Sequence, residues 1–384
     1  MTRRTIIVMG IMGRTPVAGV AWQFLHFVEG LRRLGHDVYY VEDTLAWPYN
    51  PDTGASDSAY TVNYINRLMT WCGMGDRWAF RDVSLDRRVF GISESALQDV
   101  FERADALINV TGSTELQESY LGVPVRIYLE TDPVAPQIQI ANGDRYTIDF
   151  LDAHTHHFTY GENIGKPDCS IPTSGYKYFP TRQPVVLDWW RTPDCLCPAV
   201  FTTVSSWSQS NDVTWNGETY SWSKDREFLK FLDLPARSEQ SFELALACSD
   251  QSAVSLLRSH GWRISDAMPL TRDILPYRDF IIRSRGEFTV AKEQNVRFAS
   301  GWFSDRSATY LAAGRPVITQ ETGFSAFFPS GKGLFGFTTM EEALEAVRDI
   351  VRDYEANCRA AREIAEEYFA AEKVLKNLVA TAGL

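Results

Sequence analysis

Apolar runs alternate with amphipathic stretches along the first half of the chain. Residues 4–10 form a short apolar run, residues 21–35 repeat apolar positions at helical spacing, and residues 36–43 form a second apolar run. A strand, a crossover helix and a second strand within about 40 residues are typical of a βαβ unit in a parallel sheet. Residues 106–112 and 123–132 are further apolar runs that end in polar or glycine residues, as buried parallel strands do.

The same alternation restarts in the second half. Residues 156–165 resemble a last strand of the first sheet, and the proline-rich residues 165–200 predict an interdomain linker, because proline interrupts both helices and strand ladders. Strand and helix patterns then alternate again, which predicts a second Rossmann-like domain. We therefore expect an α/β protein whose N-terminal domain covers residues 1–185, whose C-terminal domain covers 186–360, and whose last helix, 361–384, packs back on the first domain.

Composition and charge narrow the function classes. The chain has 384 residues, 45% of them hydrophobic, and a net charge of −11, so its average field repels nucleic acids and anionic membranes. No stretch reaches the roughly 18 apolar residues that a membrane span needs, and the opening run is followed by Arg14 rather than by a cleavage site. We expect a cytoplasmic protein. Its six scattered cysteines form no CxxC pair and are expected to be free thiols.

Residues 301–318 contain the most informative motif. Ser304 is a candidate N-cap, residues 305–313 a helix, and Gly314 its C-terminal stop before a buried strand. Free backbone N–H groups and the helix dipole at such a start bind phosphate. The side chains of Asp305, Arg306 and Ser307 lie in the first turn, where Arg306 adds charge and Ser307 a hydroxyl.

This segment resembles the GT-B glycosyltransferases. Ala312, Gly314, Pro316, Val317 and Ile318 carry the A-x-G-x-P-V-I pattern of that family, and residues 16–43 resemble its opening glycine-rich loop and long helix. The resemblance implies two Rossmann-like domains with parallel sheets facing across a cleft. It also implies a nucleotide-diphosphate-sugar donor on the C-terminal domain as co-substrate, no cofactor, and a small-molecule or glycan acceptor.

The chain departs from the family pattern at the positions that distinguish retaining from inverting members. Many retaining members carry two glutamates at the positions of Gly301 and Thr309, and an inverting member often has a histidine in the first loop, which residues 10–20 lack. The stereochemical outcome therefore stays open. A divalent metal is not expected either, because the chain has no Asp-x-Asp pair and His154, His156 and His157 lack further ligands at suitable spacing.

Candidate donor contacts lie at several strand ends of the second domain. The resemblance places a sugar-contacting turn after the strand that ends near residue 319 and a base-flanking strand at 261–267. Basic side chains around 283–292 are expected to neutralise the leaving diphosphate, with Lys224 and Arg226 as rivals. The predicted donor residues are thus Arg263, Asp266, Arg285, Lys292, Ser304, Asp305, Arg306, Ser307, Gln320, Glu321, Thr322 and Gly323.

The acceptor side is predicted on the first domain. Glu130 and Asp132 end a strand that should face the cleft, and either carboxylate is a candidate general base. Asp132 is further stiffened by the following Pro133. The remaining predicted acceptor-side residues are Gly13, Val17, Ala18, Gly19, Glu42 and His154.

Three other functions compete with sugar transfer. A Rossmann dehydrogenase is disfavoured because Gly10, Gly13 and Gly19 do not form G-x-G-x-x-G. A non-hydrolysing nucleotide-sugar epimerase would share the scaffold, and a two-lobed binding protein without catalysis would share the cleft. Aromatic residues such as Trp47 and Tyr49 hint at an apolar or aromatic acceptor.

Overall fold

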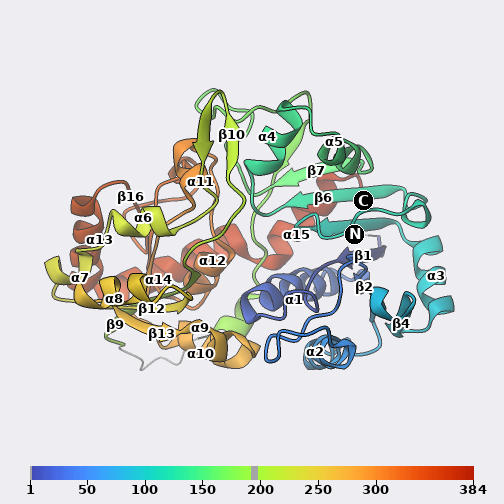
Figure 1. Cartoon of the computed structure of the whole chain (residues 1–384), viewed down its shortest axis with the longest axis horizontal. Helices are drawn as coiled ribbons and strands as arrows, with labels where there is room; N and C mark the ends of the chain where they lie inside the picture. The colour runs from blue at the N-terminus through green and yellow to red at the C-terminus, as the bar shows by residue number, and fades with distance from the viewer. Residues whose placement is uncertain (1, 192–197) are drawn as a thin grey trace.

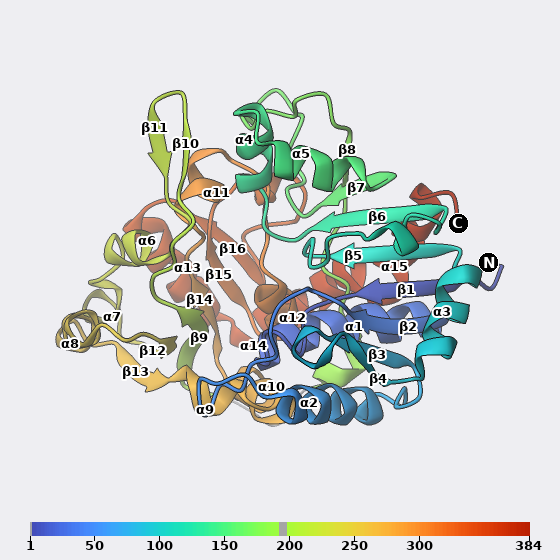
Figure 2. The same ribbon diagram turned by 45° about the vertical axis from the view of Figure 1, so that its right-hand side comes forward.

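The computed structural model describes residues 2–191 and 198–384, which form two sheets with flanking helices (Figure 1, Figure 2). The described strands of the first sheet all lie before residue 181, and those of the second lie between residues 200 and 337. The expected α/β architecture with two Rossmann-like sheets is confirmed. Both termini lie beside the first sheet.

The first sheet has eight strands in the order β4-β3-β2-β1-β5-β6-β7-β8, and every pair is parallel except β3 with β4. Its central strands β1 and β5 are almost wholly buried, which explains their uninterrupted apolar sequences. The strands are β1 (Thr5–Met9), β2 (Asp37–Glu42), β3 (Trp78–Asp82), β4 (Arg88–Gly91), β5 (Ala106–Val110), β6 (Val125–Glu130), β7 (His156–Thr159) and β8 (Tyr178–Pro180). The connecting helices are α1 (Ala18–Arg33), α2 (Ser58–Trp71), α3 (Glu94–Arg103), α4 (Ala135–Ala141) and α5 (Arg145–Asp152).

The second sheet has six parallel strands in the order β13-β12-β9-β14-β15-β16. They are β9 (Val200–Ser206), β12 (Ser241–Ala247), β13 (Arg263–Asp266), β14 (Gly286–Thr289), β15 (Val317–Gln320) and β16 (Leu334–Phe337). The flanking helices are α6 (Asp225–Leu229), α7 (Leu234–Arg237), α8 (Gln251–Ser259), α9 (Ala267–Thr271), α10 (Ile274–Ile282), α11 (Glu293–Arg297), α12 (Asp305–Ala312) and α13 (Met340–Arg352). Each sheet reverses its strand order once, between β1 and β5 and between β9 and β14, and such switch points open a crevice for ligands.

Two elements differ from the sequence expectation. The proline-rich segment predicted as a linker contains β8, which pairs with β7 at the edge of the first sheet, where a proline is tolerated. The second domain also contains an unexpected hairpin of β10 (Val213–Trp215) and β11 (Glu218–Tyr220). Asn216 and Gly217 at its tip both have positive φ, as a two-residue hairpin turn requires.

The chain ends in helices that return to the first domain. After α14 (Tyr354–Ile364), helix α15 (Ala371–Thr381) lies against α1. The approach is close, because a Cβ added at Gly30 would come within 2.5 Å of the Leu375 side chain. The largest hydrophobic core is accordingly continuous from α1 to α12 and α15.

Four of the six cysteines lie in the part of the chain that the structure describes. Cys72, Cys169, Cys248 and Cys358 are free thiols, while Cys195 and Cys197 lie outside the described residues. Within the described ranges, no helix combines the length and the apolar character needed to cross a bilayer.

Candidate functional site

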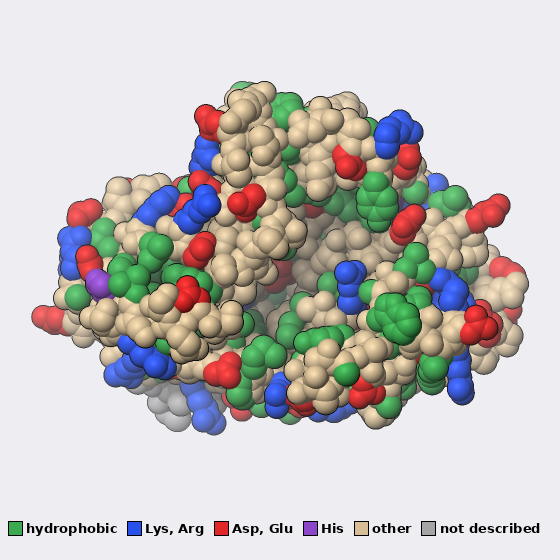
Figure 3. Space-filling view, viewed as in Figure 1, with side chains coloured by type: hydrophobic (Ala, Val, Ile, Leu, Met, Phe, Trp, Pro, Cys, Tyr) green, Lys and Arg blue, Asp and Glu red, His purple; other side chains and the backbone are tan. Residues whose placement is uncertain are grey.

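The space between the two domains is closed on two sides and hollow in the middle (Figure 3). On one side the hairpin packs against α4, where Val213 joins Val134 and Ile138 in one apolar cluster and the Asn142 amide donates to the Thr214 carbonyl at 3.0 Å. On the other side Arg272 pairs with Asp52 at 2.6 Å. The carboxyl ends of the two sheets face each other between these contacts.

The turn that follows β6 crosses this space and is held by the second domain. The Trp302 indole donates to the Thr131 carbonyl at 2.9 Å, and the Gln294 amide donates to the Pro133 carbonyl at 3.2 Å. Between them, the Lys292 ammonium donates to the Asp132 carboxylate. Three consecutive residues of the first domain are therefore bound by side chains of the second.

Asp132, one of the two predicted bases, lies at the centre of this contact. Its side chain is 26% exposed, and one of its oxygens, Oδ1, is buried without a hydrogen-bond partner within the described chain. The Lys292 ammonium that contacts the other oxygen also lies 3.3 Å from the ring centroid of Trp222. Burial lowers the pKa of Lys292, and the charge of Asp132 partly offsets this.

Glu130, the other predicted base, has a different environment. Its carboxylate is buried below the turn, where it accepts hydrogen bonds from Gln137 at 2.8 Å and from the Thr159 hydroxyl at 2.7 Å. Burial raises its pKa to about 7. Gln137 also accepts from the Val134 N–H at 2.8 Å, and Val134 has a φ of 94°, a strained value for a β-branched residue. The prediction of Glu130 as a base facing the cleft is thus wrong, because its oxygens are used to hold the turn that carries Asp132.

Three cations gather opposite Asp132. Arg306 is fixed in place, because its guanidinium donates to Glu287 at 2.5 Å, to the Val204 carbonyl at 2.7 Å and to Thr289 at 2.8 Å. Lys224 lies within the field of Arg306 and Lys292, and no carboxylate of the described chain is within ion-pair distance of it. Burial lowers the pKa of Lys224 well below its usual value, and the two neighbouring cations lower it further. Of the two rivals from the sequence, Lys224 thus lies in the site, whereas Arg226 is exposed and is 3.9 Å from Glu293.

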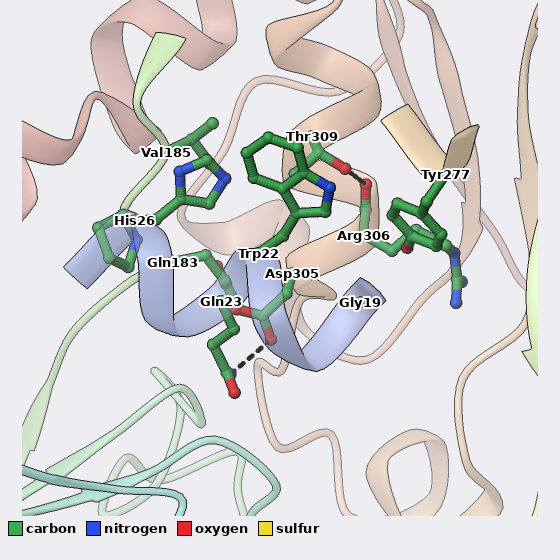
Figure 4. Close-up of a pocket in the computed structure, with 11 residues that line it drawn as sticks. Gly19, Trp22, Gln23, His26, Gln183, Val185, Tyr277, Asp305, Arg306 and Thr309 are labelled. Carbon is green, nitrogen blue, oxygen red and sulfur yellow. Dashed lines mark hydrogen bonds between the residues drawn. The ribbon is translucent and has the colours of Figure 1, made fainter. Parts of the chain in front are cut away.

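The predicted phosphate-binding helix is α12, and its first turn lies at the interface (Figure 4). Ser304 occupies the N-cap position without making a side-chain cap, and Gly314 follows the helix with a φ of 64°. Ser307 is buried, and its hydroxyl has no partner in the described chain. Asp305 accepts a hydrogen bond from Gln23 of α1 at 3.2 Å, and burial raises its pKa to about 7.

The turn after β15 uses its polar groups internally. Gln320 is buried, donates to Glu227 at 2.6 Å and accepts from the Ala291 N–H at 3.2 Å. Glu321 accepts from the N–H groups of Thr322 at 3.0 Å and Gly323 at 2.6 Å. The Thr322 hydroxyl donates to the Trp302 carbonyl at 2.5 Å. These residues shape the loops around Lys292 and Trp302.

Two predicted donor contacts lie at the wrong edge of the second sheet. Arg285 precedes β14, donates to the Pro198 carbonyl at 3.1 Å and lies over the Tyr354 ring. Arg263 is the first residue of β13. Both therefore lie at the amino ends of parallel strands, away from the cleft, and these two predictions are wrong. Asp266 ends β13, and its carboxylate caps α9 by accepting from the Met268 N–H at 2.9 Å.

On the acceptor side, Glu42 shapes the loop that contains Gly13. Glu42 is buried, and it accepts from the N–H groups of Gly13 at 2.7 Å and Arg14 at 2.6 Å and from the Tyr40 hydroxyl at 2.7 Å. Burial raises its pKa to about 7. Its predicted role as an acceptor contact is corrected to that of a loop anchor, because no part of the side chain is exposed.

The rest of this loop leads into α1 at the interface. Val17 occupies the N-cap position and Ala18 is the first, buried residue of the helix. A Cβ added at Gly19 would lie 3.5 Å from the Tyr277 hydroxyl of the second domain. The start of α1 therefore approaches the second domain.

His154 is an interior residue of the first domain. Its ring nitrogens contact the Asn109 amide at 3.0 Å and the Phe150 carbonyl at 2.9 Å, and burial lowers its pKa to about 4. The prediction that it lies on the acceptor surface is therefore wrong. Within the described ranges, no three His, Cys, Asp or Glu side chains are grouped so that they could hold a metal ion.

Sequence reasoning missed Gln23, Trp222 and Trp302. For Trp222 the sequence left a sugar-binding surface and packing at the domain interface open, and in the structure Trp222 lies two residues after β11. The Asn-Gly pair between short β-rich runs was the one local signal that could have revealed the hairpin. The roles of Gln23 and Trp302 depend on contacts across the cleft, for which the sequence gives no local signal.

Comparison with known proteins supports the architecture. No protein-family model and no curated protein matches the sequence, whereas solved structures match the chain over its full length. HepE of Anabaena, in complex with UDP and glucose, aligns with a TM-score of 0.59 at 11% identity and covers 99% of this chain and 100% of its own. The chain has the GT-B fold.

Two further structures extend this likeness. An alpha-glucosyltransferase in complex with UDP and a 13-mer DNA containing a HMU base aligns with a TM-score of 0.61 at 10% identity, covering 100% of both chains. A glycosyltransferase involved in avilamycin A biosynthesis aligns with a TM-score of 0.53 at 12% identity, covering 99% of this chain and 97% of its own. Identities this low establish the fold and leave the activity to be argued from the GT-B site itself.

Proposed function

We propose that this GT-B protein is a glycosyltransferase that moves a sugar from a UDP-sugar to an acceptor hydroxyl. The observation that carries the proposal is the grouping of Lys224, Lys292 and Arg306 beside the start of α12, directly opposite Asp132. Lys224 is a partly buried cation, no carboxylate of the described residues lies within ion-pair distance of it, and its two neighbouring cations repel it. Such a site is incomplete without an anion, and a diphosphate has the charge that fits it.

The two sides of the cleft then have separate roles. The cations and the helix start stabilise the charge that grows on the diphosphate as the glycosidic bond breaks. Asp132 accepts the proton of the acceptor hydroxyl as that oxygen attacks the anomeric carbon. The bound UDP-sugar in similar GT-B structures supports UDP as the nucleotide to test first.

The acceptor is proposed to be a small molecule or a glycan. Trp47, 65% exposed, and Tyr49, 43% exposed, follow β2 at the carboxyl edge of the first sheet and offer flat apolar surface. The net charge of −11 disfavours a nucleic-acid acceptor, although one similar structure holds DNA. Transfer to short DNA, tested beside a panel of small aromatic and sugar acceptors, checks this assignment.

A titration and a product assay together separate the candidate functions. Isothermal titration with UDP and a panel of UDP-sugars, followed by product analysis with and without acceptors, should give micromolar binding and acceptor-dependent transfer, a range typical of enzyme substrates. Conversion of the UDP-sugar without any acceptor would favour the epimerase. Binding without any product would favour the two-lobed binding protein.

We also propose that transfer needs no divalent metal, since the three cations and the helix start supply the positive charge that a metal would supply. Turnover in excess EDTA should match turnover in buffer. Loss of turnover that magnesium or manganese restores would contradict this charge assignment.

A further inference from the structure

The Asp132–Lys292 ion pair joins the candidate base to the candidate diphosphate site. Lys292 is only 9% exposed, and its ammonium lies between the Asp132 carboxylate and the Trp222 ring. The charges of Lys292 and Arg306 both act on Lys224. In the free protein the Lys292 ammonium therefore contacts the Asp132 carboxylate and also lies within the field of Lys224.

The turn that carries Asp132 is fixed independently of this ion pair. Trp302 holds the Thr131 carbonyl, Gln294 holds the Pro133 carbonyl, and Gln137 holds the Val134 N–H at a strained backbone angle. A strained turn persists where its surroundings over-determine it. If Lys292 moves toward an anion, Asp132 therefore stays in position and loses the ammonium that contacts it.

We propose that Lys292 is a positioning residue shared between Asp132 and the donor, so that the donor must bind before Asp132 can act as a base. In the free protein the ammonium masks the carboxylate. A bound diphosphate attracts the ammonium and unmasks the carboxylate. The acceptor O–H proton then passes to Asp132, the new bond forms between that oxygen and the anomeric carbon, and UDP leaves with the electron pair of the broken bond. This inference rests on the proposed function.

A double-mutant cycle on UDP affinity tests the sharing directly. Titration calorimetry would compare the wild type, Asp132→Asn, Lys292→Met and the double variant, with thermal unfolding to confirm that each is folded. Asp132→Asn should bind UDP roughly three- to tenfold more tightly, because the diphosphate no longer competes with a partly buried ion pair. In the Lys292→Met background the same substitution should change UDP affinity by less than about twofold.

A matched control separates this competition from general repulsion between charges. Asp305→Asn removes a carboxylate from the same interface that is not bonded to Lys292. Its effect on UDP affinity should be the same with lysine or methionine at position 292. Lys292→Arg, which keeps a cation beside Asp132, should restore the dependence on Asp132 that Lys292→Met removes.

The possible results separate a failure of the Lys292 sharing from a failure of the proposed function. If Asp132→Asn gives no gain, or gives the same gain in the Lys292→Met background, Lys292 is not shared and the proposal is overturned while UDP binding stands. If the wild type binds neither UDP nor any UDP-sugar, the proposed function fails and the sharing falls with it. A gain that needs Lys292 and is recovered by arginine supports the proposal.

Discussion

The carboxyl edges of the two sheets carry opposite charges and satisfy them differently. On the first sheet Glu42, Asp43 and Glu130 are buried, and each is bonded within its own domain; Asp43, for example, pairs with Arg87 at 2.8 Å. On the second sheet Arg306 is paired internally, Lys292 finds its partner across the cleft, and Lys224 has none in the described chain. Charged side chains at strand ends therefore stabilise the loops of their own domain when their partners lie in that domain.

This contrast identifies which charges are available for chemistry. Asp132, which follows β6, has its partner Lys292 in the other domain. The second edge has an excess of positive charge in a buried setting, which favours an anionic ligand over an internal ion pair. The difference between the edges supports the proposal that the second domain binds the donor and the first domain binds the acceptor.

The largest expected effect comes from removing the carboxylate that faces the cleft. Asp132→Asn should lower the rate of sugar transfer by roughly 100-fold or more, because a general base contributes about that much, while UDP binding is retained. Single-turnover assays with saturating donor measure the chemical step. Glu130→Gln is the matched control two residues away, and an equal loss of rate from it would mean that the turn, rather than the Asp132 carboxylate, is what matters.

The next largest effect is expected from Lys224, which has no carboxylate partner among the described residues. Lys224→Met should weaken UDP binding by about 1.5 to 3 kcal/mol, the range for hydrogen bonds to charged groups. Because burial and neighbouring cations lower the pKa of Lys224 and a bound diphosphate raises it, the wild type should take up protons on binding. Calorimetry in buffers of different ionisation enthalpy measures that uptake. Arg226→Met, an exposed neighbour, should change neither quantity.

The smallest expected effect is on the pH dependence of the free energy of unfolding, to which the buried carboxyl groups contribute. Burial raises the pKa of Glu42, Glu130 and Asp305 to about 7, above their values in an unfolded chain. Between about pH 4 and pH 7 the folded protein therefore binds more protons than the unfolded chain, so its free energy of unfolding falls as the pH rises through this window. Denaturant unfolding at pH 5, 6, 7 and 8 measures the slope.

Removing one of these groups should flatten that slope. Asp305→Asn takes away one titrating carboxyl group and should reduce the pH dependence by its share. Asp144, which is exposed and has a lowered pKa, is the matched control: Asp144→Asn should leave the slope between pH 5 and pH 8 unchanged. If Asp305→Asn leaves the slope of the unfolding free energy against pH unchanged and Asp144→Asn alters it, the buried carboxyl groups are not the groups that bind the extra protons.

The local sequence determined most of the architecture. Apolar runs that end in polar residues identified central strands such as β1 and β6, because a strand buried on both faces needs a continuous apolar sequence. Helix α12 was predicted from its N-cap and Gly314, since capping and a positive φ are local requirements. The hairpin was missed although its Asn-Gly turn is equally local.

Tertiary structure decided which candidate residues face each other. Glu130 is the last residue of β6 and Asp132 lies two residues beyond it, yet Asp132 contacts Lys292, 160 positions away in sequence, whereas Glu130 is enclosed by Gln137 and Thr159. Strand periodicity cannot separate them, because residues two apart share a face until the chain turns. Arg285 and Arg263 were misplaced for a simpler reason: both precede or begin strands, and only the sheet shows that this is the edge away from the cleft.

The sequence by itself thus determined the two sheets, helix α12 with its glycine stop, and the presence of a carboxylate after β6. Only the tertiary structure decided that Lys224 has no carboxylate partner among the described residues and that Lys292 contacts Asp132 across the cleft, because these facts depend on the distances between elements that lie far apart in sequence. Local propensity acts over a few residues, whereas the balance of charge in a buried site is set by every group that folding brings within a few ångströms of it.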